Sequence, residues 1–179
     1  MKTPVAVAVA ALAIAGLGFG ASEALVSAKT MAAVEDAMND AFRAPGAEPY
    51  VILGTARGTY LGGYGALMTV ELQLVEVPQI NPFRPSYSPQ EIAVIRDRKL
   101  KKLPVLREAM RGLLASSAMT LDSLPLNEHV AIEARLWQYR WEDSKGIPQR
   151  IFMSAEKSKL LAARSNAAAL AAVIDEQEQ

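Results

Sequence analysis

Apolar and polar residues alternate with a period of two in residues 66–77 and 129–142. This pattern is typical of β-strands that bury one face. A strand-like run around Thr59 precedes the first stretch across a glycine-rich turn, and a run at 147–155 follows the second across the turn DSKG. Because short turns between such runs favour hairpins, the sequence predicts two antiparallel hairpins that form one sheet of about four strands.

Three other segments have the composition or spacing of helices. Residues 29–43 carry a narrow apolar stripe, so we expect a short helix that packs loosely. Residues 89–119 begin within the helix-capping sequence SPQE at 88–91, with Ser88 as the cap, and this predicts a long helix. Pro104 inside it predicts a kink or a break near Lys102. A helix rich in Ala and Leu is expected over 155–173, before an acidic tail. The expected fold class is therefore α+β, with the sheet covered on one face by the long kinked helix and the carboxy-terminal helix.

The amino-terminal residues combine a short basic start with a long apolar run. The sequence MKT precedes small apolar residues over 4–20, and VSA at 26–28 supplies the small residues that signal peptidase accepts. We therefore expect a signal peptide over residues 1–28, cleaved after Ala28, and a periplasmic or secreted protein.

An uncleaved membrane anchor is the alternative interpretation of this segment. A spanning helix needs about 20 apolar residues, and 4–20 reaches that length only if it extends towards Val26. The membrane would then be a partner of the protein. Residues 29–179 are expected to form a single α+β domain, which is long enough to bury a sizeable core.

The composition argues against several classes of function. Lys plus Arg equals Asp plus Glu at 19 each, so no basic field favours nucleic acid. The chain contains no cysteine, which excludes disulfides, thiolate catalysis and thiolate metal sites. The spacing of His129 and the carboxylates matches no metal-binding motif. We therefore expect neither a metal nor a cofactor, and no nucleic-acid partner.

Glycines are concentrated in residues 54–65, GTARGTYLGGYG. A phosphate-binding loop would lead into a helix, and a Walker-type loop would also contain a lysine, but these glycines lead into a strand and no lysine occurs from 44 to 98. The stretch instead predicts a hairpin turn in which glycines supply positive φ angles. Tyr60 and Tyr64 would flank this turn and either pack or offer their rings to a ligand.

Two carboxylates are candidates for catalysis. Glu71 and Glu133 lie in the middle of the two long predicted strands, on the more polar face. If these strands pair, the carboxylates could serve as acid and base of a hydrolase, with Arg57 near the substrate. The alternative is an ordinary cross-strand ion pair between Glu71 and Arg135, and this is what we expect on a half-exposed sheet face.

Aromatic and basic residues supply weaker signals. Trp137, Tyr139 and Trp141 alternate along the second long strand and would form either a binding platform on one face or, more commonly, core beneath a helix. His129, the only histidine, accompanies no nucleophile motif and is expected in a solvent-facing loop. The basic run RDRKLKK at 96–102 is expected to be a solvated helix face.

Three segments of the chain resemble a family of exported bacterial proteins: RGTYLGGYGALMTVELQL, KLKKLPVLREAM and YRWEDSKGIPQRIFMSA. The most distinctive feature is the motif Arg-Gly-x-Tyr-Leu-x-Gly-Tyr-Gly before a strand. The resemblance implies export. Because no activity is attached to this family, the resemblance implies no site residues.

The sequence as a whole favours an exported domain of the cell envelope with a non-enzymatic binding or assembly role. Its partner would be an envelope protein or a small ligand. The alternative is an envelope hydrolase that uses Glu71 and Glu133. The candidate binding residues are Tyr60, Tyr64, Trp137, Tyr139 and Trp141.

Overall fold

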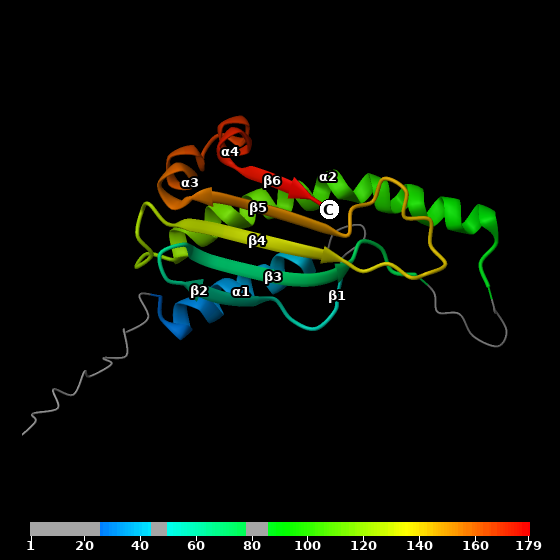
Figure 1. Ribbon diagram of the computed structural model, residues 1–179, viewed down its shortest axis with the longest axis horizontal. Coiled ribbons are helices and arrows are strands. Elements are labelled where there is room, and N and C mark those ends of the chain that lie inside the picture. The colour runs from blue at the N-terminus through cyan, green and yellow to red at the C-terminus, as the bar shows by residue number, and fades with distance from the viewer. Residues whose placement is uncertain (1–25, 44–49, 78–85) are drawn as a thin grey trace, which may run out of the picture.

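The structure, a computed structural model, describes residues 26–43, 50–77 and 86–179. The sheet has the order β1–β3–β4–β5–β6, and β2 also pairs with β3. Helices α1 and α2 lie on one face of this sheet, whereas α3 and α4 lie beyond the end of β5 (Figure 1). The predicted α+β class is confirmed. The elements in chain order are α1 (Ala28–Arg43), β1 (Val51–Ile52), β2 (Arg57–Leu61), β3 (Gly65–Gln73), α2 (Pro89–Thr120), β4 (His129–Leu136), β5 (Arg150–Glu156), α3 (Lys157–Ala163), α4 (Ala167–Val173) and β6 (Asp175–Glu178).

The sheet has six strands, and one of its pairings is parallel. Hairpins β2–β3 and β4–β5 are antiparallel as predicted, but β3 and β4 run in the same direction, with Gly65 opposite His129. The strand count and this pairing differ from the prediction. The cause is α2, because its 32 residues span about 48 Å and carry the chain back past the whole of β3.

The glycine-rich stretch forms the turn of the β2–β3 hairpin, as predicted. Gly63 has a φ of 79° and Gly65 a φ of 139°, in a region that other residues rarely adopt. Gly65 also lies against β4, because a Cβ atom added to it would stand 1.9 Å from the carbonyl oxygen of His129. The closest approach of β3 to β4 therefore has room only for glycine.

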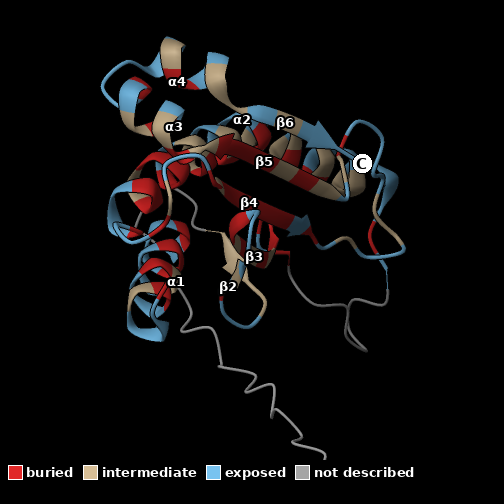
Figure 2. Cartoon of the chain, turned by 60° about the vertical axis from the view of Figure 1, so that its left-hand side comes forward, coloured by how far each residue is buried: buried red, intermediate tan, exposed pale blue. Residues whose placement is uncertain are grey.

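Helices α1 and α2 and the inner face of the sheet enclose one hydrophobic core (Figure 2). Two side chains fix α1 to the chain at β2: Asn39 accepts from the amide of Ala56 at 2.9 Å, and Glu35 accepts from the amide of Gly58 at 2.7 Å. The expectation that this helix packs loosely was wrong, because its whole apolar stripe is buried. That stripe consists of Met31, Val34, Met38 and Phe42.

A kink or a break was predicted near Lys102, and the break does not occur, because α2 is one continuous helix with Pro104 inside it. Pro104 itself is exposed, whereas Leu103 and Leu106 on either side of it are buried. A proline on the outer side of a helix removes one hydrogen bond without entering the core. Burial on both sides of Pro104 therefore keeps the two halves in one helix.

Side chains close both ends of α2. At its start, Ser88 and Glu91 form the predicted capping box, with the Ser88 amide 2.9 Å from the Glu91 carboxylate. Directly after its end, the buried ammonium group of Lys157 donates to three backbone carbonyls of the following turn, which offsets the cost of burying its charge. Burial lowers the pKa of Lys157. The three carbonyls belong to Leu121, Asp122 and Leu124, at 2.6, 3.0 and 2.8 Å.

The single helix expected over 155–173 is instead the end of β5 followed by two short helices, and the acidic tail is a strand. Helix α4 has its own cap, because Asn166 accepts from two backbone amides of its first turn. Strand β6 pairs with β5, and its Glu176 lies 2.9 Å from both Arg107 and Arg111 of α2. These ion pairs hold an acidic segment, which has little intrinsic strand propensity, at the edge of the sheet.

The predicted leader lies mostly outside the described residues. Of residues 1–28, the last three are described: Val26 is buried in the core, and Ser27 accepts from the amide of Thr30 at 3.1 Å at the start of α1. Cleavage after Ala28 would therefore remove a core residue and a helix cap. In the described part of the chain, no helix is long and apolar enough to cross a membrane.

Replacing Gly65 by alanine is expected to lower the free energy of unfolding by about 3 kcal/mol, because the methyl group would meet the His129 carbonyl in a strained backbone. Gly62→Ala is the control, since nothing lies within 4 Å of its Cβ position and its φ is not positive. It should change stability by less than about 1 kcal/mol. Urea denaturation followed by circular dichroism measures both, and equal stability of the two variants would contradict the close approach.

Lys157→Met is expected to lower the free energy of unfolding by about 3 kcal/mol, because three carbonyls at the end of α2 lose their donor. Lys159→Met makes the same change two residues away, where the side chain is exposed, and should cost less than about 0.5 kcal/mol. Denaturation in guanidinium chloride measures the free energy of unfolding of both variants. A similar loss in both variants would mean that Lys157 does not hold the end of this helix.

Candidate functional site

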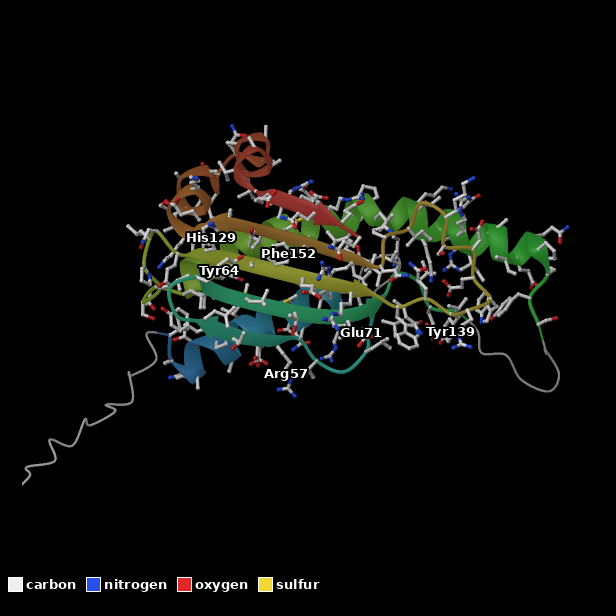
Figure 3. The ribbon with its side chains drawn as sticks, viewed as in Figure 1. Arg57, Tyr64, Glu71, His129, Tyr139 and Phe152 are labelled. Carbon is white, nitrogen blue, oxygen red and sulfur yellow. The ribbon has the colours of Figure 1, made fainter. Side chains whose placement is uncertain are left out.

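One face of the sheet is covered by no helix of the described chain, and we call it the open face (Figure 3). Because side chains alternate along a strand, every second residue of the central strands points out from this face. The strand register places these residues in rows across the sheet. The charged and aromatic members include Arg57 from β2, Glu71 from β3, Glu133 and Arg135 from β4, and Arg150 and Phe152 from β5.

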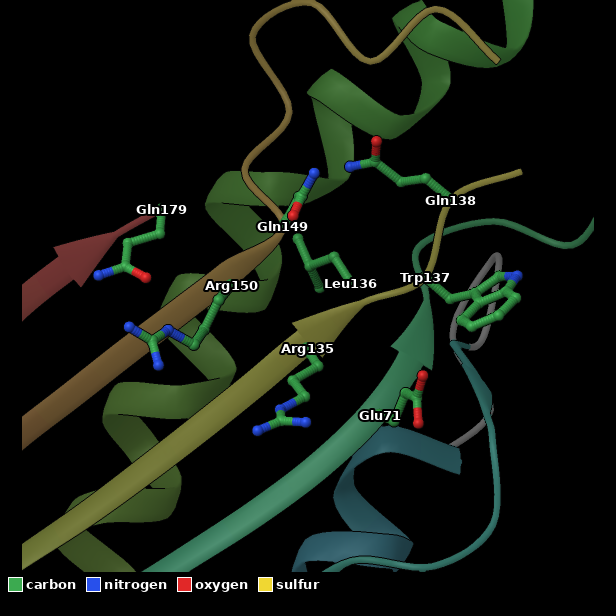
Figure 4. A pocket seen from close by; sticks show the side chains of 8 residues that line it. All are labelled: Glu71, Arg135, Leu136, Trp137, Gln138, Gln149, Arg150 and Gln179. Carbon is green, nitrogen blue, oxygen red and sulfur yellow. The ribbon is translucent and has the colours of Figure 1, made fainter. Parts of the chain in front are cut away.

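A pocket of about 400 Å³ hollows the open face where β3 and β4 end and β5 begins (Figure 4). We call it the strand-end pocket. An adjoining cavity of about 300 Å³ shares Glu71 and Arg135 with it. A pocket of this size is within the range of small-molecule sites. Its polar and aromatic lining includes Glu71, Arg135, Trp137, Gln138, Arg150 and Gln179.

Arg135 is a neighbour of both candidate catalytic carboxylates but pairs with one of them. Its Nε atom donates to Glu133 at 2.7 Å, and the Glu133 side chain is only 11% exposed, against 67% for Arg135. Glu71 is opposite Arg135 in the β3–β4 register. Glu133 and, less strongly, Glu71 raise the pKa of Arg135. Arg135 therefore forms its ion pair with Glu133 rather than with Glu71, the partner that we had expected. Arg57, the third residue of the proposed catalytic site, lines neither cavity.

Arg150 stands beside Arg135 without a counter-charge. The two residues are cross-strand neighbours on β4 and β5, and both line the strand-end pocket (Figure 4). Within the described residues, the guanidinium group of Arg150 makes no hydrogen bond or ion pair. Like charges placed directly opposite each other repel. An anion bound here would relieve that repulsion and give Arg150 a partner.

The aromatic residues after β4 do not share one strand face, because β4 ends at Leu136. Trp137 is 46% exposed and lines the strand-end pocket. Trp141 instead stacks between Tyr139 and Tyr87, with ring centroids 5.6 and 4.3 Å away. Of the three residues predicted to form a platform, Trp137 is the one that reaches the pocket.

Tyr60 and Tyr64 lie at the other end of the sheet from the strand-end pocket (Figure 3). The Tyr60 hydroxyl donates to Glu128 at 3.1 Å, and burial together with this carboxylate raises the pKa of Tyr60. The Tyr64 ring stacks on His129, with centroids 5.4 Å apart. His129 is thus the half-buried first residue of β4 rather than a loop residue. The predicted binding aromatics therefore form separate groups.

The basic run at 96–102 is not uniformly solvated, because Lys99 is buried. Its side chain is 2% exposed and forms an ion pair with Glu142, which is 3% exposed. Sequence reasoning missed this pair because a lysine in a basic run looks solvated. The spacing of the sequence did indicate that Lys99 is buried, since it lies four residues after Ile95 and four before Leu103 on the buried stripe of α2.

In the part of the chain that the structure describes, no three His, Asp or Glu side chains lie close enough to hold a metal ion. Comparison with protein-family models, with curated proteins and with solved structures gave no match. A function for this chain is therefore inferred from its own geometry.

Arg135→Gln is expected to lower the urea concentration at the midpoint of unfolding, because Glu133 would be left almost buried without its partner. Arg150→Gln is the matched control on the same face, and it should change stability by less than about 0.5 kcal/mol, since no partner is lost. Urea denaturation at neutral pH measures both variants. A larger loss for Arg150→Gln would show that Arg150 has a structural role.

Proposed function

We propose that this protein is an exported cell-envelope domain that binds a small anionic ligand in the strand-end pocket and catalyses no reaction on it. The observation that carries the proposal is the position of Arg150, an uncompensated guanidinium beside a second guanidinium in a pocket of about 400 Å³. The planar guanidinium group matches the two oxygens of a carboxylate or a phosphate. The pocket therefore suits an anionic group.

The other lining residues suit a ligand that also has polar groups and a flat face. Trp137 presents an exposed ring, which supplies apolar contact area with a defined orientation. The side-chain amides of Gln149 and Gln179 can each donate and accept hydrogen bonds. The amide nitrogen of Gln138 already donates to the carbonyl of Pro148 at 3.3 Å, which leaves its oxygen to accept. A carboxylated sugar or peptide combines all these features.

Binding is favoured over hydrolysis by Glu71 and Glu133. An acid/base couple needs both carboxylates free to meet the substrate and its attacking water. Arg135 instead donates to Glu133 at 2.7 Å and lies opposite Glu71 on the neighbouring strand. A substrate would have to displace this guanidinium before Glu133 could act on it, and Glu71 alone cannot form an acid/base couple.

The location in the envelope is proposed from the apolar amino-terminal run and from the resemblance to exported proteins. Muropeptides, the sugar and peptide fragments of the cell wall, are anionic ligands of that compartment. They carry sugar rings that can lie on Trp137 and free carboxylates that can meet Arg150. They are accordingly the probe of choice.

Isothermal titration of the full chain with a disaccharide muropeptide is expected to show binding, and amidation of the peptide carboxylates should weaken it at least about tenfold. Arg150→Gln and Trp137→Ala should each lower the affinity of the protein for the unmodified muropeptide by about tenfold. Arg140→Gln is the control, because Arg140 is exposed in the loop between β4 and β5, three residues after Trp137, but does not line the pocket.

Absence of binding would refute muropeptide as the ligand, and equal affinities of wild type and Arg150→Gln would refute the role of Arg150. Mass spectrometry of the probe after incubation tests the alternative function. Cleavage that is lost in Glu71→Gln and retained in Arg150→Gln would support the hydrolase instead.

A further inference from the structure

Exposed apolar side chains gather at the end of the domain opposite the strand-end pocket. We call it the α1 end, because α1 begins there, and Figure 2 turns it towards the viewer. The side chains come from the β2–β3 turn, the last turn of α2 and the loop before β4. Of the eight large apolar side chains exposed in the described part of the chain, four lie here: Leu61, Tyr64, Met119 and Leu126, with exposures of 44%, 38%, 54% and 58%.

Hydrogen bonds join these segments into one surface. The amide of His129 donates to the carbonyl of Tyr64 at 2.7 Å, and the amide of Ser158 donates to the carbonyl of Leu126 at 3.0 Å. Lys157 holds the residues that follow α2 in the same place. The segments that carry Tyr64 and Leu126 are therefore held by hydrogen bonds to the start of β4 and of α3.

The chain enters the domain at this same end. Helix α1 runs opposite to β2, because Glu35 bonds to Gly58 whereas Asn39, one turn later, bonds to Ala56. Its first residues therefore lie near the β2–β3 turn. Val26, just before α1, is buried in the core, so the folded domain starts no later than this residue.

In the sequence, the apolar run 4–20 is separated from the first described residue by a short stretch. Only residues 21–25 separate it from Val26, and a stretch of that length spans at most about 20 Å. Cleavage after Ala28 would remove Val26 from the core and Ser27 from the start of α1. A chain that keeps these residues can also keep the apolar run.

We propose that the apolar run 4–20 stays attached as a membrane anchor and that the α1 end lies on the surface of the lipid bilayer. The short spacer holds this end within about 20 Å of the anchor, and the four exposed apolar side chains then contact the interfacial region of the lipid. Lys29 is exposed at the same end and suits anionic head groups. Lys159 is also exposed there but pairs with Glu156 at 3.6 Å, and Asp122 adds a negative charge.

This inference goes beyond the ligand-binding proposal and does not depend on it. The strand-end pocket lies at the far end of β4, whose eight residues span about 26 Å. The pocket therefore lies at a distance from the bilayer. Loss of ligand binding and loss of membrane contact can be measured separately.

The absence of cysteine allows a direct test with single labels on the full chain. Asn127→Cys places an environment-sensitive fluorophore at the α1 end, and Ser144→Cys places it in the β4–β5 loop near the pocket. Each labelled chain is reconstituted in vesicles of phosphatidylethanolamine and phosphatidylglycerol that contain a lipid-attached quencher. Mass measurement of the chain purified from bacterial membranes shows whether residues 4–20 are retained.

We expect a retained apolar run, a blue-shifted and quenched label at position 127, and an unquenched label at position 144. Leu61→Ser, Met119→Ser and Leu126→Ser together should reduce quenching at position 127 about fivefold, whereas Val94→Ser with Val105→Ser, two exposed positions elsewhere on α2, should not. A trimmed chain, equal quenching at both labels, or a label shielded by a second copy rather than by lipid would overturn the proposal.

Discussion

The parallel pairing of β3 with β4 determines where the other features of this domain lie. The register starts at the contact between Gly65 and His129, so both amino ends lie at one end of the sheet and both carboxyl ends at the other. Glu71 and Arg135 become cross-strand neighbours only in this register. The strand-end pocket therefore lies at the carboxyl ends of two parallel strands joined by a crossover helix, which is a common position for ligand sites in such sheets.

Two neighbouring arginines on the open face have different roles because their surroundings differ. Arg135 forms an ion pair with the almost buried Glu133, so its charge stabilises the fold. Arg150 has the same chemistry, lies on the adjacent strand, and has no acidic partner among the described residues. An uncompensated charge in a pocket costs little while it is hydrated, and it is available to a ligand that replaces its water. The contrast between the two residues, rather than the presence of arginine, is the basis on which we propose the pocket as a binding site.

Signals from neighbouring residues in the sequence predicted local structure. They did not predict which residues pair when these are far apart in the chain. The capping box before α2 and the glycine turn before Gly65 follow from neighbouring residues, and both were predicted. Strand β6 was missed because its acidic sequence forms a strand only against the arginines of α2. Lys99 was missed because its partner Glu142 lies 43 residues away. Arg150 is a candidate binding residue because its guanidinium group has no partner among the described residues, and this can be seen only in the three-dimensional structure.

The two ends of the sheet differ in chemistry, and this difference links the proposals. The α1 end displays apolar side chains beside the entry of the chain, whereas the opposite end displays guanidinium and amide groups around a pocket. A domain held by its α1 end would present the pocket about 26 Å from the bilayer surface, as far as β4 is long. Lipid head groups would not reach it at that height. A ligand for Arg150 must then come from a soluble molecule or from a polymer that stands above the membrane, which is why a cell-wall fragment is a better probe of this pocket than a lipid.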